Sequence, residues 1–334
     1  MASQQTEAPC CGQRVFSSIQ ELSKSRTSTE TPSPAPKLPL TSPERLANAS
    51  SEKTILYLAY GSNLSAETFK GVRGIKPLSA INAHIPSLNL TFDLPGIPYL
   101  EPCFANTAYR TPETQSSSPT KNDYHKDRWH KGLIGVVYEV TPEDYRTIIA
   151  TEGGGASYKD ILVDCYALPS GLKTVNPTPQ GTPFTAHTLL DSGSRLSRPD
   201  PSYAQASARY LKLLTDGGEE HSLPEEYMAY LYNLRSYEIT TRRQKMGRAL
   251  FLGIWAPFIL ALSTFGKTLA DDEGKIPGWF AKVMELVFRC MWGSYDVGFK
   301  KVFGDGERTI GDTGDEEEVG RKWWCEKGER GVMI

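Results

Sequence analysis

Residues 55–63 read ILYLAYGSN, and this stretch decides how the middle of the chain is interpreted. The apolar run from Ile55 to Ala59 is typical of a buried strand, which then ends in the turn Tyr60-Gly61-Ser62-Asn63. Residues 64–70 indicate a short helix after the turn. A strand, a glycine-containing turn and a helix together present free backbone N–H groups and the positive end of a helix dipole. Such a turn favours a carboxylate or a developing oxyanion, although the same residues also suit an ordinary β-turn.

Beyond the turn, strands and helices follow one another irregularly as far as residue 236. The hydrophobic patterns predict strands at residues 88–92, 103–109, 132–138, 158–168 and 184–190. They predict helices at residues 141–150, 202–215 and 224–234. This irregular order favours an α+β fold, a small mixed β-barrel with flanking helices, over a doubly wound parallel sheet.

The composition divides the chain into four parts. Residues 1–52 are rich in Ser, Thr, Pro, Gln and Glu, and we expect a disordered tail. Residues 53–236 carry the α+β pattern. Residues 237–303 form a helical extension, and residues 304–334 are an acidic, Gly-rich tail that we expect to be solvated.

The helical extension contains one segment that is apolar enough to meet a membrane. Residues 249–265 carry no formal charge, at the short end of what crosses a hydrocarbon core of about 30 Å. Basic residues at positions 242, 243, 245 and 248 precede it, so a span would leave the preceding domain in the cytoplasm. The alternative is a buried helix interrupted at Pro257. Residues 278–293 form an amphipathic helix that either lies on a membrane surface or packs on its own domain.

Charge and cysteine content exclude several classes of protein. The formal net charge of the 334 residues is -2, without the basic stripe of a nucleic-acid binder. The cysteines have neither the spacing of a zinc site nor that of a disulfide framework, so we expect no zinc site and a reducing compartment. They are Cys10, Cys11, Cys103, Cys165, Cys290 and Cys325.

A second candidate for chemistry is Glu152, which stands where a predicted helix meets a run of three glycines. Partial burial there would raise its pKa towards neutrality and suit it to move protons. The alternative is a solvated acid near a helix C-terminus, which the helix dipole disfavours slightly.

Several motifs in order resemble the γ-glutamyl cyclotransferase family. They are YLAYGSN, then GVVYEVTPEDYRTIIATEGG, then RPDPSYAQASARYLKLLTDGGEEHSLPEEYMAYLYNL. The resemblance covers about residues 54–236 and is nearest to the fungal type found in gliotoxin biosynthesis, with residues 104–107 as the equivalent of the family's central strand. Two long loops, 111–131 and 169–183, depart from compact members of the family, and the resemblance does not extend past residue 238.

The resemblance implies a site and a reaction. It implies that Tyr57, Leu58, Ala59, Tyr60, Gly61 and Ser62 hold the γ-glutamyl group of a small-molecule substrate, that Glu152 is the catalytic acid and base, and that Tyr203 borders the substrate. Asn63 belongs to the same turn. The implied reaction is that of a lyase, which releases 5-oxoproline from a γ-glutamyl amine or peptide, such as a glutathione-derived adduct, with no metal and no cofactor.

Two other hypotheses stay open on the sequence. One is a non-catalytic, membrane-tethered module that binds an anionic small ligand in the same pocket. The other is a hydrolase with Ser62 or a cysteine as nucleophile. The chain lacks the Gly-x-Ser-x-Gly motif that such a hydrolase would have, and no histidine has a spacing that marks it as a partner base.

Overall fold

The computed structural model describes residues 38–48, 53–110, 129–151, 158–191, 198, 200, 203–269 and 276–311. Its centre is a closed barrel with the strand order β1-β5-β2-β6-β7. These strands are β1 (Ile55–Ala59), β2 (Ser79–Ile85), β5 (Leu133–Val140), β6 (Tyr158–Leu168) and β7 (Phe184–Asp191). All neighbouring pairs are antiparallel except β1 and β7, which are parallel. The predicted small mixed barrel is confirmed.

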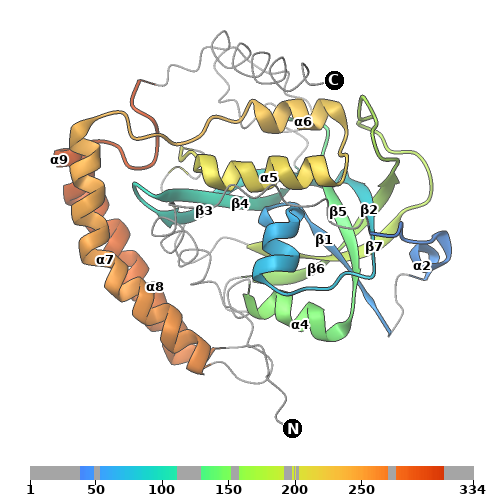
Figure 1. The fold of residues 1–334 in the computed structure, drawn as a ribbon, viewed down its shortest axis with the longest axis horizontal. Helices are drawn as coiled ribbons and strands as arrows, with labels where there is room; N and C mark the ends of the chain where they lie inside the picture. Colours follow the sequence, from blue (N-terminus) through green and yellow to red (C-terminus); the bar gives the residue numbers. More distant parts are fainter. Residues whose placement is uncertain are drawn as a thin grey trace, which may run out of the picture.

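Helices and a two-stranded sheet surround the barrel (Figure 1). The sheet consists of β3 (Leu88–Ile97) and β4 (Glu101–Tyr109). The remaining elements of this part are α2 (Pro43–Ala47), η1 (Ser62–Leu64), η2 (Glu67–Val72), α4 (Pro142–Thr151), α5 (Ala208–Glu220) and α6 (Glu225–Tyr232). Figure 1 shows α5 and α6 on one side of the barrel and α4 on the opposite side.

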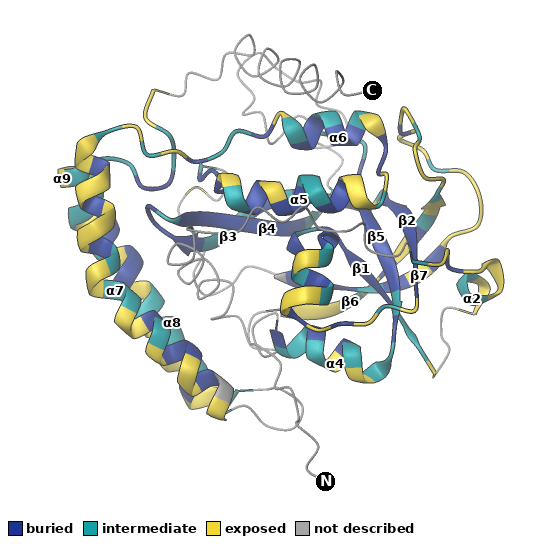
Figure 2. Ribbon diagram, viewed as in Figure 1, coloured by how far each residue is buried: buried dark blue, intermediate teal, exposed yellow. Residues whose placement is uncertain are grey.

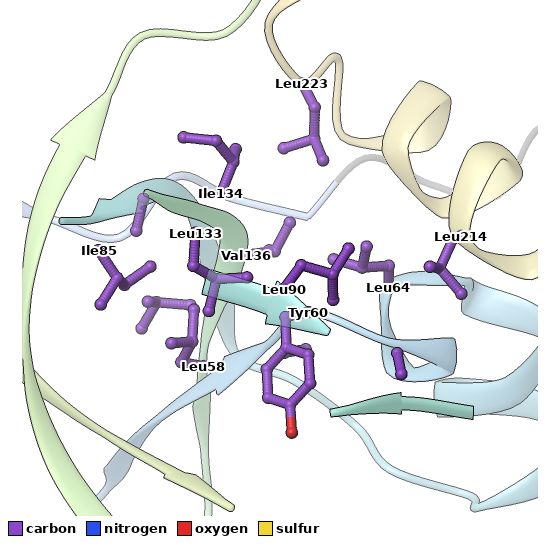
Figure 3. Packing of buried hydrophobic residues seen from close by; sticks show 14 of the residues in the cluster. Leu58, Tyr60, Leu64, Ile85, Leu90, Leu133, Ile134, Val136, Leu214 and Leu223 are labelled. Carbon is purple, nitrogen blue, oxygen red and sulfur yellow. The ribbon is translucent and has the colours of Figure 1, made fainter. Parts of the chain in front are cut away.

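The main hydrophobic core joins the barrel to α5 and α6. Figure 3 shows part of it, with Leu58 of β1, Leu64 of η1 and Leu214 of α5 in one cluster. A second core lies between the β3–β4 turn and the C-terminal helices, and includes Tyr99, Phe251 and Tyr295. The helical extension is therefore joined to the barrel domain by an apolar contact of its own.

The C-terminal extension is a helical hairpin. Its elements are α7 (Arg242–Leu269), α8 (Gly278–Ser294), η4 (Tyr295–Phe299) and α9 (Lys300–Phe303). Helix α7 continues through Pro257, and 28% of its apolar window is buried. The helix is therefore not interrupted at Pro257, and whether it spans a membrane stays a prediction.

Three further expectations differ from the structure. Residues 38–48 fall within the segment expected to be disordered, yet Leu40 pairs with Ala80 of β2 and Arg45 forms an ion pair with Glu139. Helix α5 begins only at Ala208, because Ser207 caps it by accepting a hydrogen bond from the Tyr210 N–H. It also continues through Gly217, where a Cβ would lie 2.4 Å from the Leu64 carbonyl carbon, so this glycine permits close packing and does not end the helix.

Candidate active site

The Tyr60-Gly61-Ser62-Asn63 turn lies at the end of β1 and leads into η1, as the sequence predicts. Within the described residues, the backbone N–H groups of Gly61 and Ser62 have no hydrogen-bond partner. The Ser62 side chain is only 4% exposed, and its hydroxyl also lacks a partner among those residues. Buried donors without partners are rare in proteins, and they mark a place where a ligand atom can complete the hydrogen bonds.

The turn is held rigidly from its own strand side. The Tyr60 hydroxyl donates to the Leu189 carbonyl of β7 over 2.8 Å. The Asn63 side-chain amide donates to the Tyr57 hydroxyl over 2.8 Å, and the Tyr57 ring stacks on Phe69. Because these bonds fix the residues on both sides of Gly61 and Ser62, the free N–H groups need little rearrangement to meet a charged ligand atom.

Helix α5 holds the turn from the opposite side. Its Glu220 carboxylate accepts a hydrogen bond from the Ala66 N–H over 2.8 Å.

On β5, the Tyr138 hydroxyl lies 3.3 Å from the Leu64 carbonyl and 2.7 Å from His221 Nε2. Burial, followed by the charge of Lys70, lowers the pKa of His221 to about 4. The imidazole is therefore neutral at physiological pH and shares a hydrogen bond with the Tyr138 hydroxyl.

Tyr210 of α5 reaches the turn itself. A Cβ on Gly61 would lie 3.1 Å from the Tyr210 hydroxyl oxygen and 3.5 Å from the Ala105 Cβ. The same hydroxyl accepts a hydrogen bond from the Ala105 N–H of β4 over 3.2 Å. The Phe104 ring packs edge-on against the Tyr210 ring. The structure thus brings together β1, β4 and α5 at Gly61, where a side chain would have little room.

Tyr210 was not among the residues predicted from the sequence. The signal that could have found it is Ser207, a helix-capping residue three positions earlier, which fixes the start of α5 and hence the face on which Tyr210 lies. Tyr203 was predicted instead. Its described side-chain contacts are with Asp305, Lys300 and Arg308 of the C-terminal segment. The structure does not bring Tyr203 to the turn through any of these contacts, and its role at the substrate stays a prediction.

The other predicted residues of β1 support the turn from the strand. Tyr57, Leu58 and Ala59 are buried and pair with Tyr138, Val137 and Val136 of β5. The Leu58 carbonyl also accepts a hydrogen bond from the Thr188 hydroxyl of β7. Their position explains how the turn is placed, and direct contact of Leu58 and Ala59 with substrate stays a prediction.

Glu152 lies outside the described residues. The residue before it, Thr151, is the last of α4 and is buried. The Arg73 guanidinium donates a hydrogen bond to the Thr151 hydroxyl, and Tyr145 of α4 packs against Tyr57 of β1. The helix that leads to Glu152 is therefore fixed against the strand that carries the turn.

The part of the chain that the structure describes contains no group of three or more His, Cys, Asp or Glu side chains that could hold a metal ion. Among the same residues, the cysteines at positions 103, 165 and 290 are free thiols.

Curated relatives of this chain are fungal proteins that share the description gamma-glutamyl cyclotransferase. The chain is 31% identical to the gamma-glutamyl cyclotransferase gliK of Aspergillus fumigatus over 259 residues, which is 76% of this chain and 89% of that protein. It is 30% identical to the gamma-glutamyl cyclotransferase aclK of Aspergillus oryzae over 265 residues, 77% of this chain and 91% of that protein. The chain belongs to the γ-glutamyl cyclotransferase family.

The relationship extends into the C-terminal helices of this cyclotransferase. A family described as the AclK C-terminal domain matches residues 241–302. Among solved structures, one titled gamma-glutamyl cyclotransferase is 21% identical with a TM-score of 0.39, and covers 57% of this chain and 93% of its own. A yeast enzyme titled as specific to glutathione is 17% identical with a TM-score of 0.35, and covers 54% of this chain and 94% of its own.

Proposed function

We propose that this cyclotransferase acts as a lyase on a γ-glutamyl amine or peptide and releases 5-oxoproline and the free amine. The observation that supports this most is the pair of N–H groups at Gly61 and Ser62, which have no hydrogen-bond partner in the part of the chain that the structure describes. They lie at a rigid turn, beside a buried hydroxyl, in a chain whose relatives bear the cyclotransferase name. The relatives are named as enzymes, so the comparisons do not support the alternative of a non-catalytic binding module.

The proposed reaction needs no nucleophile from the protein. The α-amine of the γ-glutamyl group attacks its own side-chain carbonyl, and a new C–N bond closes a five-membered ring. The tetrahedral intermediate carries an oxyanion, and its collapse breaks the bond to the departing amine. Glu152 takes a proton from the attacking nitrogen and returns it to the leaving nitrogen, so protons balance over the cycle.

The turn contributes to this reaction by stabilising charge and by positioning the substrate. Its N–H groups stabilise negative charge on the bound substrate, either the α-carboxylate or the oxyanion. A substrate held curled with the amine near the carbonyl also gains the advantage of an intramolecular reaction. The two assignments of the donors differ in kinetics, because loss of a carboxylate contact raises KM whereas loss of an oxyanion contact lowers kcat.

Replacement of the proposed acid and base tests the catalytic assignment. Glu152→Gln should lower 5-oxoproline release by about 100-fold or more, since it removes the group that moves the proton. The assay is mass spectrometry of 5-oxoproline with a panel of γ-glutamyl compounds, including glutathione and its S-linked adducts. Glu143→Gln is the matched control, because Glu143 is an exposed acid on α4, the helix that precedes Glu152 in the chain. Full activity of Glu152→Gln would sink the assignment.

The same assay separates the lyase from a hydrolase. Ser62→Ala should keep measurable cyclisation, because in a lyase the serine is only a donor. A cysteine nucleophile is disfavoured at Cys165, since burial, followed by the charge of Asp164, raises the pKa of its thiol and so suppresses the thiolate. Complete loss of turnover in Ser62→Ala, together with a trapped acyl-enzyme in the wild type, would favour the hydrolase.

We also propose that the C-terminal helices associate with a membrane while the catalytic domain lies in the cytoplasm. Residues 242–266 of α7 are long and apolar enough to cross a membrane, and only 28% of the apolar window is buried. The basic residues at the start of α7 support the cytoplasmic side, where anionic lipids are enriched.

A further inference from the structure

Helices α7 and α8 form a hairpin at one edge of the molecule (Figure 1). Phe251 and Ile259 of α7 and Met291 of α8 are fully buried in the second hydrophobic core. The Trp255 indole N–H of α7 donates to the Ser294 hydroxyl of α8 over 3.1 Å. Each helix therefore uses one face to pack on its neighbour, which leaves another face for solvent or a partner.

The base of the hairpin is tied firmly to the barrel domain. Arg198 forms ion pairs with Asp296 and Glu307, and its guanidinium lies 4.0 Å from the centre of the Trp292 ring. Tyr99, at the turn between β3 and β4, has a positive φ of 63° and donates its hydroxyl to the Gly304 carbonyl. Its ring also sits where a Cβ on Gly306 would clash. The hairpin thus has a fixed attachment to the catalytic domain.

The free face of α7 is mostly apolar between Met246 and Phe265. By the helical repeat of about 100° per residue, its exposed large side chains fall within an arc of about 120°. They are Met246, Leu250, Ile254, Phe258 and Phe265. Phe258 is 53% exposed, and on α8 Trp279 and Leu286 are each 60% exposed. Figure 2 shows exposed positions along both helices. An apolar stripe of this extent marks an interaction surface.

The charges around this face are mostly basic. Apart from Asp296, whose side chain is 40% exposed and pairs with Arg198, the exposed charged side chains in the described residues of α7, α8, η4 and α9 are basic. They are Arg242, Arg243, Lys245, Arg248, Lys282, Arg289 and Lys301. Of the acidic residues in these helices, Glu285 pairs with Arg289 and Asp296 pairs with Arg198. An apolar stripe among basic residues fits an anionic lipid surface, whereas a second copy of the chain would bring like charges together.

The distribution of charge also indicates how the hairpin meets the lipid. If α7 crossed the membrane, its packed neighbour α8 would enter the hydrocarbon with Lys282, Glu285 and Arg289, and charges at that depth are costly. The sequence that connects the two helices carries Asp271, Asp272 and Glu273, which equally disfavours insertion from that end. A hairpin that lies flat keeps Lys282, Glu285 and Arg289 at the level of the headgroups.

We infer that the α7–α8 hairpin lies flat on an anionic membrane surface, with the exposed stripe of α7 in the interface and the helices not spanning the bilayer. This inference rests on the proposed membrane association and is independent of the proposed catalysis. The attachment at Arg198 and Tyr99 would hold the catalytic domain close to the lipid surface.

Vesicle co-sedimentation of the full chain tests the inference. The protein should bind phosphatidylcholine vesicles that contain phosphatidylserine, bind pure phosphatidylcholine vesicles much more weakly, and leave both in high salt or alkaline carbonate. Phe258→Glu should weaken binding about tenfold or more. The double variant Arg243→Glu and Lys245→Glu should reduce only the part of binding that depends on phosphatidylserine. Leu162→Glu is the matched control, because Leu162 is a 63% exposed apolar residue on β6, outside the hairpin.

The possible results are distinct. Binding that resists alkaline carbonate would show a spanning segment and overturn the flat orientation. Equal binding to neutral vesicles would overturn the role of anionic lipid. Absence of binding to either vesicle would overturn the membrane association as well. A dimer in free solution that Phe258→Glu abolishes would assign the stripe to a second copy of the chain. Release of 5-oxoproline without vesicles reports on catalysis separately and should not change in Phe258→Glu.

Discussion

At the scale of single residues, Gly61 leaves little room between the turn and Tyr210. Its missing side chain lets the Tyr210 hydroxyl approach to 3.1 Å of where a Cβ would be. A methyl group there would push the tyrosine or the turn by a few tenths of an ångström, and would so disturb the free N–H groups. Catalytic geometry tolerates such shifts poorly.

Gly61→Ala should therefore lower kcat/KM by about tenfold or more, with a smaller effect on thermal stability. Steady-state kinetics of 5-oxoproline release checks this, and a change in KM or in kcat assigns the N–H groups to the carboxylate or to the oxyanion. Gly253→Ala is the control, because a Cβ at Gly253 of α7 meets nothing within 4 Å. Unchanged kinetics in Gly61→Ala would contradict the close approach as a requirement.

Tyr210 offers a second test at this scale, with a matched tyrosine nearby in sequence. Tyr210→Phe removes the acceptor of the Ala105 N–H, so the protein should lose about 1–2 kcal/mol of unfolding free energy as well as activity. Tyr227 is equally buried, and its hydroxyl has no partner among the described residues. Tyr227→Phe should therefore be close to neutral. Denaturant unfolding compares the two, and equal losses would count against a specific role for the Tyr210 hydroxyl.

At the scale of elements, the C-terminal hairpin is held by a segment whose structure the composition does not predict. Residues 304–334 are acidic and rich in glycine, which predicts a solvated tail, yet Asp305 and Glu307 are partners in a buried network. Burial alone would raise the pKa of Asp305, but hydrogen bonds from the Tyr203 hydroxyl and the Glu307 N–H, with the charge of Lys300, hold it below its usual range. The ionised carboxylate thus stabilises the docked hairpin.

The pKa of Asp305 is lower in the folded than in the unfolded chain. Its contribution to the free energy of unfolding is therefore complete above the pKa of the unfolded chain, and is lost as pH falls through the pKa of the folded chain. Thermal unfolding followed by tryptophan fluorescence should show this loss below about pH 4. Asp305→Asn should destabilise the protein at neutral pH by about 2 kcal/mol and flatten the acid limb. Asp216→Asn, which affects an exposed pair with Lys212, should do neither. An unchanged acid limb in Asp305→Asn would refute this account of the segment.

Strand β2 shows why local patterns miss some elements. Its residues SAINAHI are buried on both faces, so the alternation that marks a half-exposed strand is absent. Two of its polar residues bond to distant partners, with Asn82 donating to the His221 carbonyl and Ser79 to Glu139. These partners lie far from β2 in the sequence, so the residues around the strand do not reveal them. Strand β6, in contrast, has the predicted bounds, 158–168.

At the scale of the whole molecule, the barrel and the turn were predictable because their signals are local or lie in ordered motifs. The run 55–59, the turn 60–63 and the helix that ends at residue 151 all appear where the sequence predicts them. The convergence of Tyr210, Ala105 and Gly61 was not predictable from the residues alone, since they lie far apart in the chain and meet only through the packing of α5 on η1. Glu152 as acid and base stays a prediction.

The central claim is that the substrate closes on its own carbonyl without water or a protein nucleophile. The most direct measurement is turnover of a γ-glutamyl compound in water enriched in oxygen-18, with mass spectrometry of both products. The account predicts 5-oxoproline without label, formed in equal amount to the free amine. Formation of glutamate that carries oxygen-18 would show hydrolysis and would contradict it.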